Sequence, residues 1–190
     1  MNIFLNTFGF LLFIVTVLLL LVFIFKLIIF FLKKKDFPKK LLSIIFICIC
    51  GFIGIFMYIQ YFFTFDTINK QHTQNGPGPI FSPTEEYSAN AYYEPYGGAG
   101  PSGDVNVWIE ITHTKDNIRK IVYYADAKSH FSMKWIDENT LSIVNEELLT
   151  PTSNRSIELN IDEEIYHENG LACQSLLMKN SYEKCYQHER

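Results

Sequence analysis

The octapeptide KKKDFPKK occupies residues 33–40 and lies between two long apolar segments. Residues 3–25 and residues 41–65 contain no charged side chain, and the apolar character of the first segment continues to residue 32. A 23-residue helix is about 34 Å long, which is enough to cross a hydrocarbon core of ~30 Å. The sequence therefore predicts a two-helix transmembrane hairpin over residues 1–65, with helices at about 3–32 and 41–65 and a basic loop at 33–40.

The basic loop also predicts the orientation of the hairpin. Cytoplasmic loops of membrane proteins carry an excess of Lys and Arg, most strongly when the loops are short. No Lys or Arg precedes Lys26, and none follows the loop until Lys70. We therefore expect a multi-pass protein of the cell membrane with a cytoplasmic loop and both termini extracytoplasmic. The opposite insertion of the hairpin is the alternative. The residues that determine this topology are Lys33, Lys34, Lys35, Lys39 and Lys40.

A cleaved signal peptide is an alternative interpretation of the first apolar segment. Signal peptides combine a basic start, an apolar core of about 7–15 residues and a small-residue cleavage site. Residues 1–25 contain no Lys or Arg, their apolar core is longer than this, and no A-x-A pattern follows. A retained membrane helix fits these features better than a cleaved signal.

Charge is divided unequally along the chain. Residues 1–65 contain six lysines and one acidic residue, whereas residues 66–190 contain ten basic and nineteen acidic residues. The acidic outer part argues against nucleic acid as a partner, because phosphate binding requires clustered cations. We expect the partners to be the lipid bilayer and an envelope or membrane protein, with no cofactor and no metal.

Period-two alternation begins after a polar segment, DTINKQHTQNGPGPI at residues 66–80, which is typical of a linker. Alternating apolar residues predict half-buried strands near residues 87–93, 105–111, 119–125, 131–135, 141–143 and 157–161. Short turn-rich gaps between successive strands favour an antiparallel meander. We therefore expect a small β domain over residues 81–161, built as one twisted sheet with Trp135 and Tyr93 near its core.

The remaining residues, 162–190, predict a partly helical tail. An acidic segment precedes Gly170, and the amphipathic pattern that follows favours a short helix, with a further strand as the alternative. Cys173 and Cys185 are the only cysteines outside the predicted membrane segments. On one continuous helix their Cα atoms would be about 18 Å apart, so a disulfide requires a turn between them. Two free thiols are the alternative. A zinc set with His167 and His188 is a further one, whose spacing matches structural zinc sites poorly.

The β region contains Ser82-Pro83 with Tyr87 nearby, a Gly-Gly-Ala stretch at 97–99 and Trp-Ile-Asp-Glu-Asn-Thr at 135–140. These motifs resemble those of a family of small Gram-positive membrane-anchored proteins of unknown function. The family's outer domain opens with Ser-Pro-Asp-Gly-Lys-Tyr, has a Gly-Gly-Ala turn and contains a Trp-Ile/Val-Asp-Asp-Asn-Thr strand pair. Residues Ser82, Pro83, Tyr87, Gly97, Gly98, Ala99, Trp135, Ile136, Asp137, Asn139, Thr140, Ile143 and Asn145 match this pattern. Thr84, Glu85 and Glu86 replace Asp-Gly-Lys. The resemblance covers about residues 81–146 and implies a fold and a location, without any chemistry.

No catalytic motif is evident in the sequence. His113 and His130 flank a predicted hairpin, where they would either form a pH-sensitive pair or be ordinary solvated histidines. The Gly-rich stretch at 97–103 matches neither a nucleophile elbow nor a phosphate loop, and we expect no enzymatic activity.

We instead expect a binding or structural module of the envelope, with a contact surface formed by Tyr92, Tyr96, Tyr123 and Tyr124. The alternative interpretation of those tyrosines is core or ordinary surface. The alternative function is a signalling or immunity-type membrane protein that acts through its helices.

Overall fold

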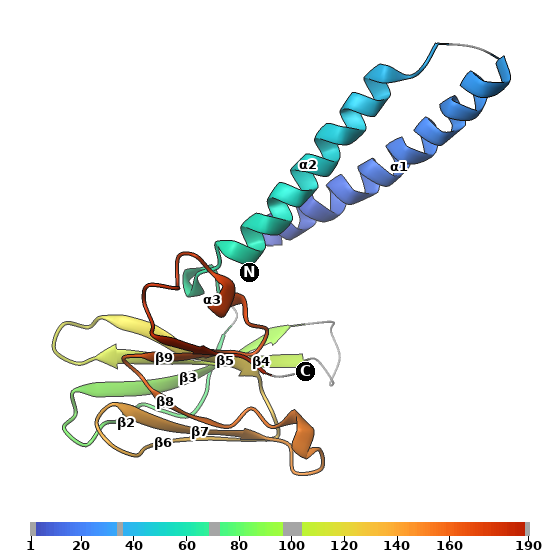
Figure 1. Cartoon of the computed structure of the whole chain (residues 1–190). Helices are drawn as coiled ribbons and strands as arrows, with labels where there is room; N and C mark the ends of the chain where they lie inside the picture. The colour runs from blue at the N-terminus through green and yellow to red at the C-terminus, as the bar shows by residue number, and fades with distance from the viewer. Residues whose placement is uncertain (1–2, 34–35, 69–72, 97–103, 189–190) are drawn as a thin grey trace. The chain divides into compact units, whose positions relative to one another are not determined.

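The computed structural model describes residues 3–33, 36–68, 73–96 and 104–188, and the chain divides into two compact units (Figure 1). The first unit is Met1–Phe62 and the second is Phe63–Arg190. Two of the predicted topology residues, Lys34 and Lys35, lie outside the described residues, as does the predicted Gly-Gly-Ala turn at 97–99.

The first unit consists of two antiparallel helices, α1 (Ile3–Lys33) and α2 (Lys39–Tyr61). The helices approach closely at small residues, since a Cβ atom added to Gly51 would lie 3.5 Å from Cδ2 of Leu12. Aromatic rings fill the neighbouring contact, with the centroids of Phe13 and Phe52 6.0 Å apart. Small residues at a helix–helix contact are typical of membrane helix pairs.

The outer surface of this helix pair is apolar along its length. Large aliphatic and aromatic side chains are exposed on both helices, including Phe10, Leu18, Phe25, Leu32, Phe46, Ile47 and Phe56. Both helices are long and apolar enough to span a membrane.

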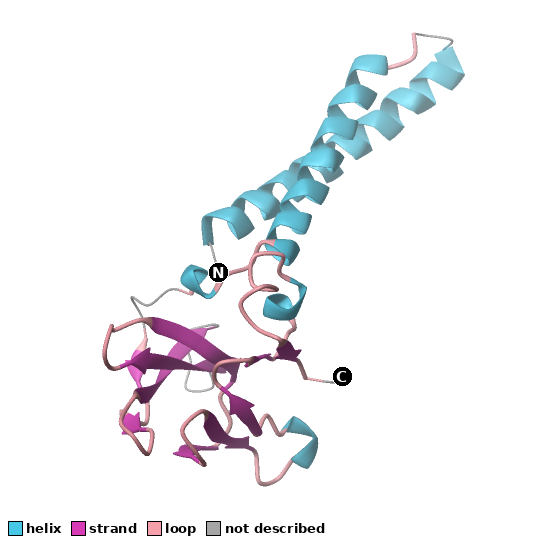
Figure 2. Ribbon diagram, turned by 60° about the vertical axis from the view of Figure 1, so that its left-hand side comes forward, coloured by secondary structure: helices cyan, strands magenta, loops and turns pink. Residues whose placement is uncertain are grey.

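The second unit contains two β-sheets, shown as separate layers in Figures 1 and 2. The described strands of the larger sheet are β1 (Gln74–Asn75), β2 (Ile80–Phe81), β3 (Tyr87–Tyr96), β4 (Asp104–His113), β5 (Arg119–Asp126), β9 (Glu164–His167) and β10 (Lys184–Tyr186). The smaller sheet contains β6 (His130–Trp135), β7 (Thr140–Glu146) and β8 (Ile157–Asn160). Short helical turns lie at Phe65–Thr67, Pro151–Ser153 and Leu171–Gln174, the last being α3.

The strand order of the larger sheet differs from the predicted meander. Its path is β1-β3-β4-β5-β9-β10, with β2 also paired to β3. The pairs β5–β9 and β9–β10 are parallel, whereas the other pairs are antiparallel. After β5 the chain builds the whole smaller sheet before it returns to the edge of β5, and such a crossover is what a parallel pair requires. The domain is therefore a two-sheet structure that is mostly antiparallel.

The main hydrophobic core lies between the two sheets. The predicted alternation is confirmed: the inward residues of the larger sheet include Ala89, Ala91, Val107, Ile109 and Ile111, and those of the smaller sheet include Leu141, Ile143 and Leu159. Trp135 belongs to this core and Tyr93 packs against it, as expected. Full burial of one such aliphatic or aromatic side chain contributes roughly 1.5–3 kcal/mol.

A second core covers the opposite face of the larger sheet. Trp108, Ile121 and Ile165 project from β4, β5 and β9 into a cluster with Phe65, Ile68 and Ala172. The larger sheet is therefore buried on both faces over its central strands. Phe65 and Ile68 belong to the segment that follows α2, so the folded unit begins well before residue 81.

The segment predicted as a linker, residues 66–80, is largely part of this fold. β1 and β2 both pair with β3, and Gly76 N–H donates to the Ala91 carbonyl at 2.9 Å. At Gly78, φ is +124° and an added Cβ would lie 2.8 Å from the Ala89 carbonyl oxygen. The glycines of this segment thus permit a close approach to β3, where composition alone indicated flexibility.

The short helix predicted in the tail is confirmed at α3, which is limited to four residues, and the acidic segment before Gly170 forms strand β9. Ile165, Tyr166 and His167 are all buried, because a strand covered on both faces shows no alternation. After α3, the Ser175 hydroxyl accepts hydrogen bonds from the N–H groups of Leu177 and Met178. This turn redirects the chain toward β10.

A buried polar network at Asn145 of β7 joins the two sheets. Its amide Nδ2 donates to the Tyr123 hydroxyl at 2.8 Å and to the Asp126 carbonyl at 2.9 Å. Its Oδ1 accepts from the Lys128 N–H at 2.8 Å, and the Tyr123 hydroxyl donates to the Arg155 carbonyl at 2.9 Å. Asn145 has no exposed surface. Two backbone groups of the segment that crosses between the sheets, the Asp126 carbonyl and the Lys128 N–H, therefore bond to this one side chain.

We predict that Asn145→Ala lowers the free energy of unfolding by about 3 kcal/mol or more, because several buried groups lose their partners. Guanidinium titration followed by fluorescence measures this in the β domain, where both tryptophans of the chain lie. The matched control is Asn139→Ala, which alters an exposed residue of the same hairpin and should cost less than about 0.5 kcal/mol. Equal effects of the two changes would contradict this role of Asn145.

Candidate functional site

Residues from the resemblance motifs meet where β2 approaches the β6–β7 turn. The Ser82 hydroxyl and the Thr84 N–H both donate to the carboxylate of Glu138, at 2.5 and 2.9 Å. The hydrogen bond from Ser82 is the main reason that the pKa of Glu138 is lowered. The indole Nε1–H of Trp135 donates to the Ile80 carbonyl at 3.1 Å. These contacts join the two sheets, which is a structural role.

A more polar cluster surrounds His113 at the end of β4. The β4–β5 turn is closed by hydrogen bonds between the backbones of His113 and Ile118 and of Asn117 and His113, both 2.9 Å. Asn117 adopts a φ of 57°, which Asn tolerates better than most residues. The turn places Asp116 Oδ1 2.6 Å from His113 Nδ1, and Glu86 Oε1 lies 3.2 Å from His113 Nε2.

The two carboxylates favour the charged form of the imidazole. The pKa of His113 is raised, chiefly by the hydrogen bond to Asp116 and then by that to Glu86. In turn, the hydrogen bond from His113 is the largest cause of the lowered pKa values of Glu86 and Asp116. Lys115 Nζ, 3.4 Å from Glu86 Oε1, also lowers the pKa of Glu86. The cluster is an ion network at the surface.

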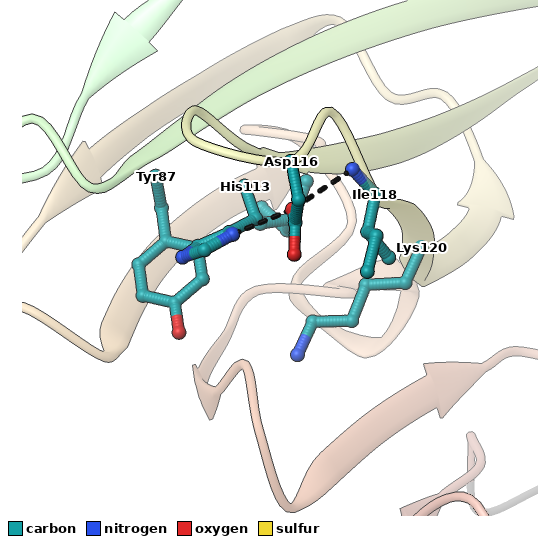
Figure 3. A pocket seen from close by; sticks show the side chains of 6 residues that line it. Tyr87, His113, Asp116, Ile118 and Lys120 are labelled. Atoms are coloured by element: carbon teal, nitrogen blue, oxygen red, sulfur yellow. Dashed lines mark hydrogen bonds and ion pairs between the residues drawn. The ribbon is translucent and has the colours of Figure 1, made fainter.

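A pocket of about 240 Å³ lies beside this cluster (Figure 3). Its lining residues are Tyr87, Ile111, His113, Asp116, Ile118 and Lys120. Tyr87 and His113 are register partners on β3 and β4, with ring centroids 5.3 Å apart. Lys120 Nζ lies 2.8 Å from Asp162. The pocket combines an aromatic face with paired charges, which suits a small ligand that has both apolar and polar groups.

The geometry around His113 is unsuited to metal binding or to general-base catalysis. Its two nitrogens face carboxylates on opposite sides of the ring, so the three groups do not converge on one point. Neither nitrogen is free to accept a proton from a substrate. Among the residues that the structure describes, no cluster of His, Cys, Asp or Glu is arranged to hold a metal ion.

We predict that His113→Gln lowers stability in a pH-dependent way. The raised pKa of His113 means that its contribution is fully present below about pH 6.5, the unfolded value, and is lost as the pH rises through the folded value. The lowered pKa values of Glu86 and Asp116 keep both carboxylates ionised at about pH 5.5. The stability difference from the native protein should therefore be larger at about pH 5.5 than at about pH 9, measured by denaturant titration.

The control for this prediction is His130→Gln, which alters an exposed histidine on the smaller sheet. Of the two alternatives left open for His113 and His130, the pair is excluded: His130 is the register partner of Glu146, and His113 is that of Tyr87 in the other sheet. Sequence reasoning did not find Glu86 and Asp116 as the partners of His113. The sequence did contain one signal for the Asp116 contact: an Asp that follows a His at the end of a strand by three residues, within a tight turn.

A buried histidine, His167, lies among aromatic rings on the face of the larger sheet that carries the second core. Its ring centroid is 4.9 Å from that of Phe63, 6.0 Å from Phe65 and 5.1 Å from Tyr124. Nδ1 has no hydrogen-bond partner among the described residues, and burial lowers the pKa of His167 to about 4. His167 is thus neutral at pH 7, and its protonation opposes folding as the pH falls from about 6.5 toward 4.

The two tail cysteines are bonded to each other. Cys173 and Cys185 form a disulfide with a Cα–Cα distance of 5.2 Å, and a turn lies between them. The bond closes the loop that follows α3. A disulfide across a loop of this length contributes roughly 3 kcal/mol at best to the free energy of unfolding. Bonded cysteines are not available as zinc ligands with His167 and His188. Cys48 and Cys50 are free thiols in α2.

The remaining predicted residues fall in different places. Lys33 ends α1, and Lys39 and Lys40 begin α2, so the basic loop separates the two helices as expected. The predicted tyrosine contact surface is wrong for Tyr123, which is fully buried and stacks on Tyr166 in the core. Tyr92 and Tyr124 are partly buried against the second core. The side chain of Tyr96 lies outside what the structure describes.

These features define a class of protein: two candidate membrane helices followed by a two-sheet, mostly antiparallel β domain. The model of a family of unknown function, DUF5412, matches residues 33–155, which is more than half of the chain. The protein belongs to this family, and the expectation of an uncharacterised family is confirmed. The matched range contains α2 and β1 to β7 and ends before β8. No curated protein and no solved structure matches the chain significantly.

Proposed function

We propose that this protein is a multi-pass membrane protein that presents its β domain outside the cytoplasm as a binding or structural module of the envelope. The observation that carries this proposal is the exposed apolar surface of α1 and α2, on two helices long enough to span a bilayer. An aqueous setting would leave that surface unfavourably hydrated. The basic residues between the helices favour a cytoplasmic loop and therefore extracytoplasmic termini.

The disulfide supports the same orientation. Bonds of this kind persist in oxidising compartments and are rare in the cytosol. Cys173 and Cys185 both lie in the second unit, so the bond favours an extracytoplasmic position for this unit as a whole. The acidic composition of residues 66–190 is suited to a hydrated domain and unsuited to a nucleic-acid partner.

A binding role is supported by the pocket beside His113. Tyr87, Ile111 and Ile118 supply apolar surface, and the ion network supplies a rigid polar rim. The occupied nitrogens of His113 favour binding without catalysis, so we assign the domain no enzymatic activity. The partner in this proposal is a molecule or protein of the envelope.

A second candidate function is signalling or immunity through the membrane helices. The observation in its favour is Gly54, where an added Cβ would have nothing within 4 Å, so α2 presents an open small-residue surface. Small residues allow a partner helix to approach closely. Gly54→Leu separates the two functions: loss of a cellular phenotype by this change, with the β domain dispensable, would favour the helices.

The orientation predicts a defined pattern of thiol labelling in intact cells. On a Cys48→Ala, Cys50→Ala background, an impermeant maleimide should label Leu149→Cys in the β domain and leave Asp36→Cys in the loop unlabelled. Leu149 is 89% exposed, and Asp36→Cys retains every loop lysine. Permeabilised cells provide the control, in which both positions react. Cys173 and Cys185 should react only after reduction.

The reverse pattern would overturn the orientation and move the search for partners to the cytoplasm. Labelling of both positions in intact cells would contradict the hairpin itself.

A further inference from the structure

The loop after α3 exposes two adjacent leucines. Leu176 is 57% exposed and Leu177 is 54% exposed, whereas the preceding residue, Ser175, is buried. Leu177 and Met178 donate their backbone N–H groups to the Ser175 hydroxyl, and Lys179 N–H donates to the Ser175 carbonyl at 3.1 Å. These bonds fix the turn, and the disulfide closes the base of the loop. The leucines are thus held on an ordered support.

The same turn is bonded to the chain that comes directly from α2. The Ser175 hydroxyl donates to the Phe63 carbonyl at 2.6 Å. Phe63 is two residues beyond Tyr61, the last residue of α2, and two residues of chain span less than about 8 Å. The backbone of Leu176 is therefore tethered within a short distance of the end of this helix, whatever the arrangement of the two units.

The end of α2 has the composition of a membrane–water interface. Tyr58, Tyr61 and Phe62 are exposed there, and the rings of Tyr58 and Phe62 stack at 5.5 Å. Aromatic residues, Tyr and Trp above all, are enriched at the headgroup level of membrane helices. A segment tethered to this point is at the depth where exposed leucines can enter the boundary between headgroups and acyl chains.

We propose that Leu176 and Leu177 form a second contact with the bilayer that α2 crosses, which docks the β domain on the membrane surface. The proposal rests on the membrane anchorage proposed above and adds a binding surface for lipid outside the helices. The exposed cation Lys179 follows the pair and suits contact with lipid phosphates. A second pair, Leu148 and Leu149, is exposed in the loop after β7. It has no hydrogen bond to the described residues that follow α2, so it is the matched comparison.

The test uses the full chain in lipid nanodiscs on the Cys48→Ala, Cys50→Ala background, with the native disulfide intact. An environment-sensitive nitrobenzoxadiazole label is attached to Leu177→Cys or to Leu149→Cys. The label at 177 should show a blue-shifted emission and lose intensity when the nanodisc contains lipid with a spin label near the headgroup. The label at 149 should show a water-like emission that is unaffected by the spin-labelled lipid.

A water-like, unquenched label at 177 would overturn the proposal. So would a blue-shifted label at 177 that spin-labelled lipid does not quench, because the leucines would then be covered by protein, either a second copy or another partner. Anchorage is read separately, from co-elution of the chain with the nanodisc. Co-elution without quenching at 177 refutes the lipid contact alone, whereas failure to co-elute refutes the anchor and the contact together.

Discussion

The crossing between the two sheets of the β domain depends on the buried amide of Asn145. The chain leaves β5 in one sheet and enters β6 in the other, and in that crossing its backbone must lose water without losing hydrogen bonds. Asn145 meets this requirement, because one side chain serves the Asp126 carbonyl, the Lys128 N–H and the Tyr123 hydroxyl. The alternating aliphatic residues supply most of the burial energy, but they are compatible with many sheet arrangements. The hydrogen bonds of the amide are satisfied in this arrangement and favour it.

A second set of polar contacts holds the carboxyl end of the domain to its centre. Glu168 follows β9 and accepts from Arg155 Nε at 2.6 Å and from the Asp126 N–H at 2.6 Å. The side chains of Arg155 and Glu168 are only 10% and 11% exposed. Breaking such a pair from one side leaves an uncompensated buried charge, which costs far more than an exposed pair contributes. The parallel strand β9 is thus positioned by charge as well as by its apolar residues.

The sequence was informative where one local signal dominates. Alternation located the six strands from β3 to β8 and the inward faces of their residues, since one face of each strand meets the core between the sheets. β9 escaped this reasoning because it is buried on both faces and carries polar residues, including His167. The segment at 66–80 was misjudged because Gly and Pro there allow close approach to β3, a role that composition does not distinguish from flexibility.

The candidate site was less predictable than the fold. His113 stood out in the sequence, but its partners come from the turn that follows it and from Glu86, which precedes β3 and lies 27 residues away along the chain. Such an arrangement depends on the register between β3 and β4, which local patterns do not fix. The turn at Ser175 depends in the same way on a contact with Phe63, 112 residues earlier.

The described residues that follow α2 do not form a long flexible linker. This limits where the domain can act. Phe65 and Ile68 are already buried in the second core, so little chain separates the end of the helix from the folded unit. If α2 is embedded in the bilayer, the domain has a much smaller range of motion than a module on a long flexible linker. In that case the domain would stay in the layer next to the bilayer, and any partner would have to reach that layer. Such confinement raises the effective concentration toward other membrane-bound molecules and excludes distant ones.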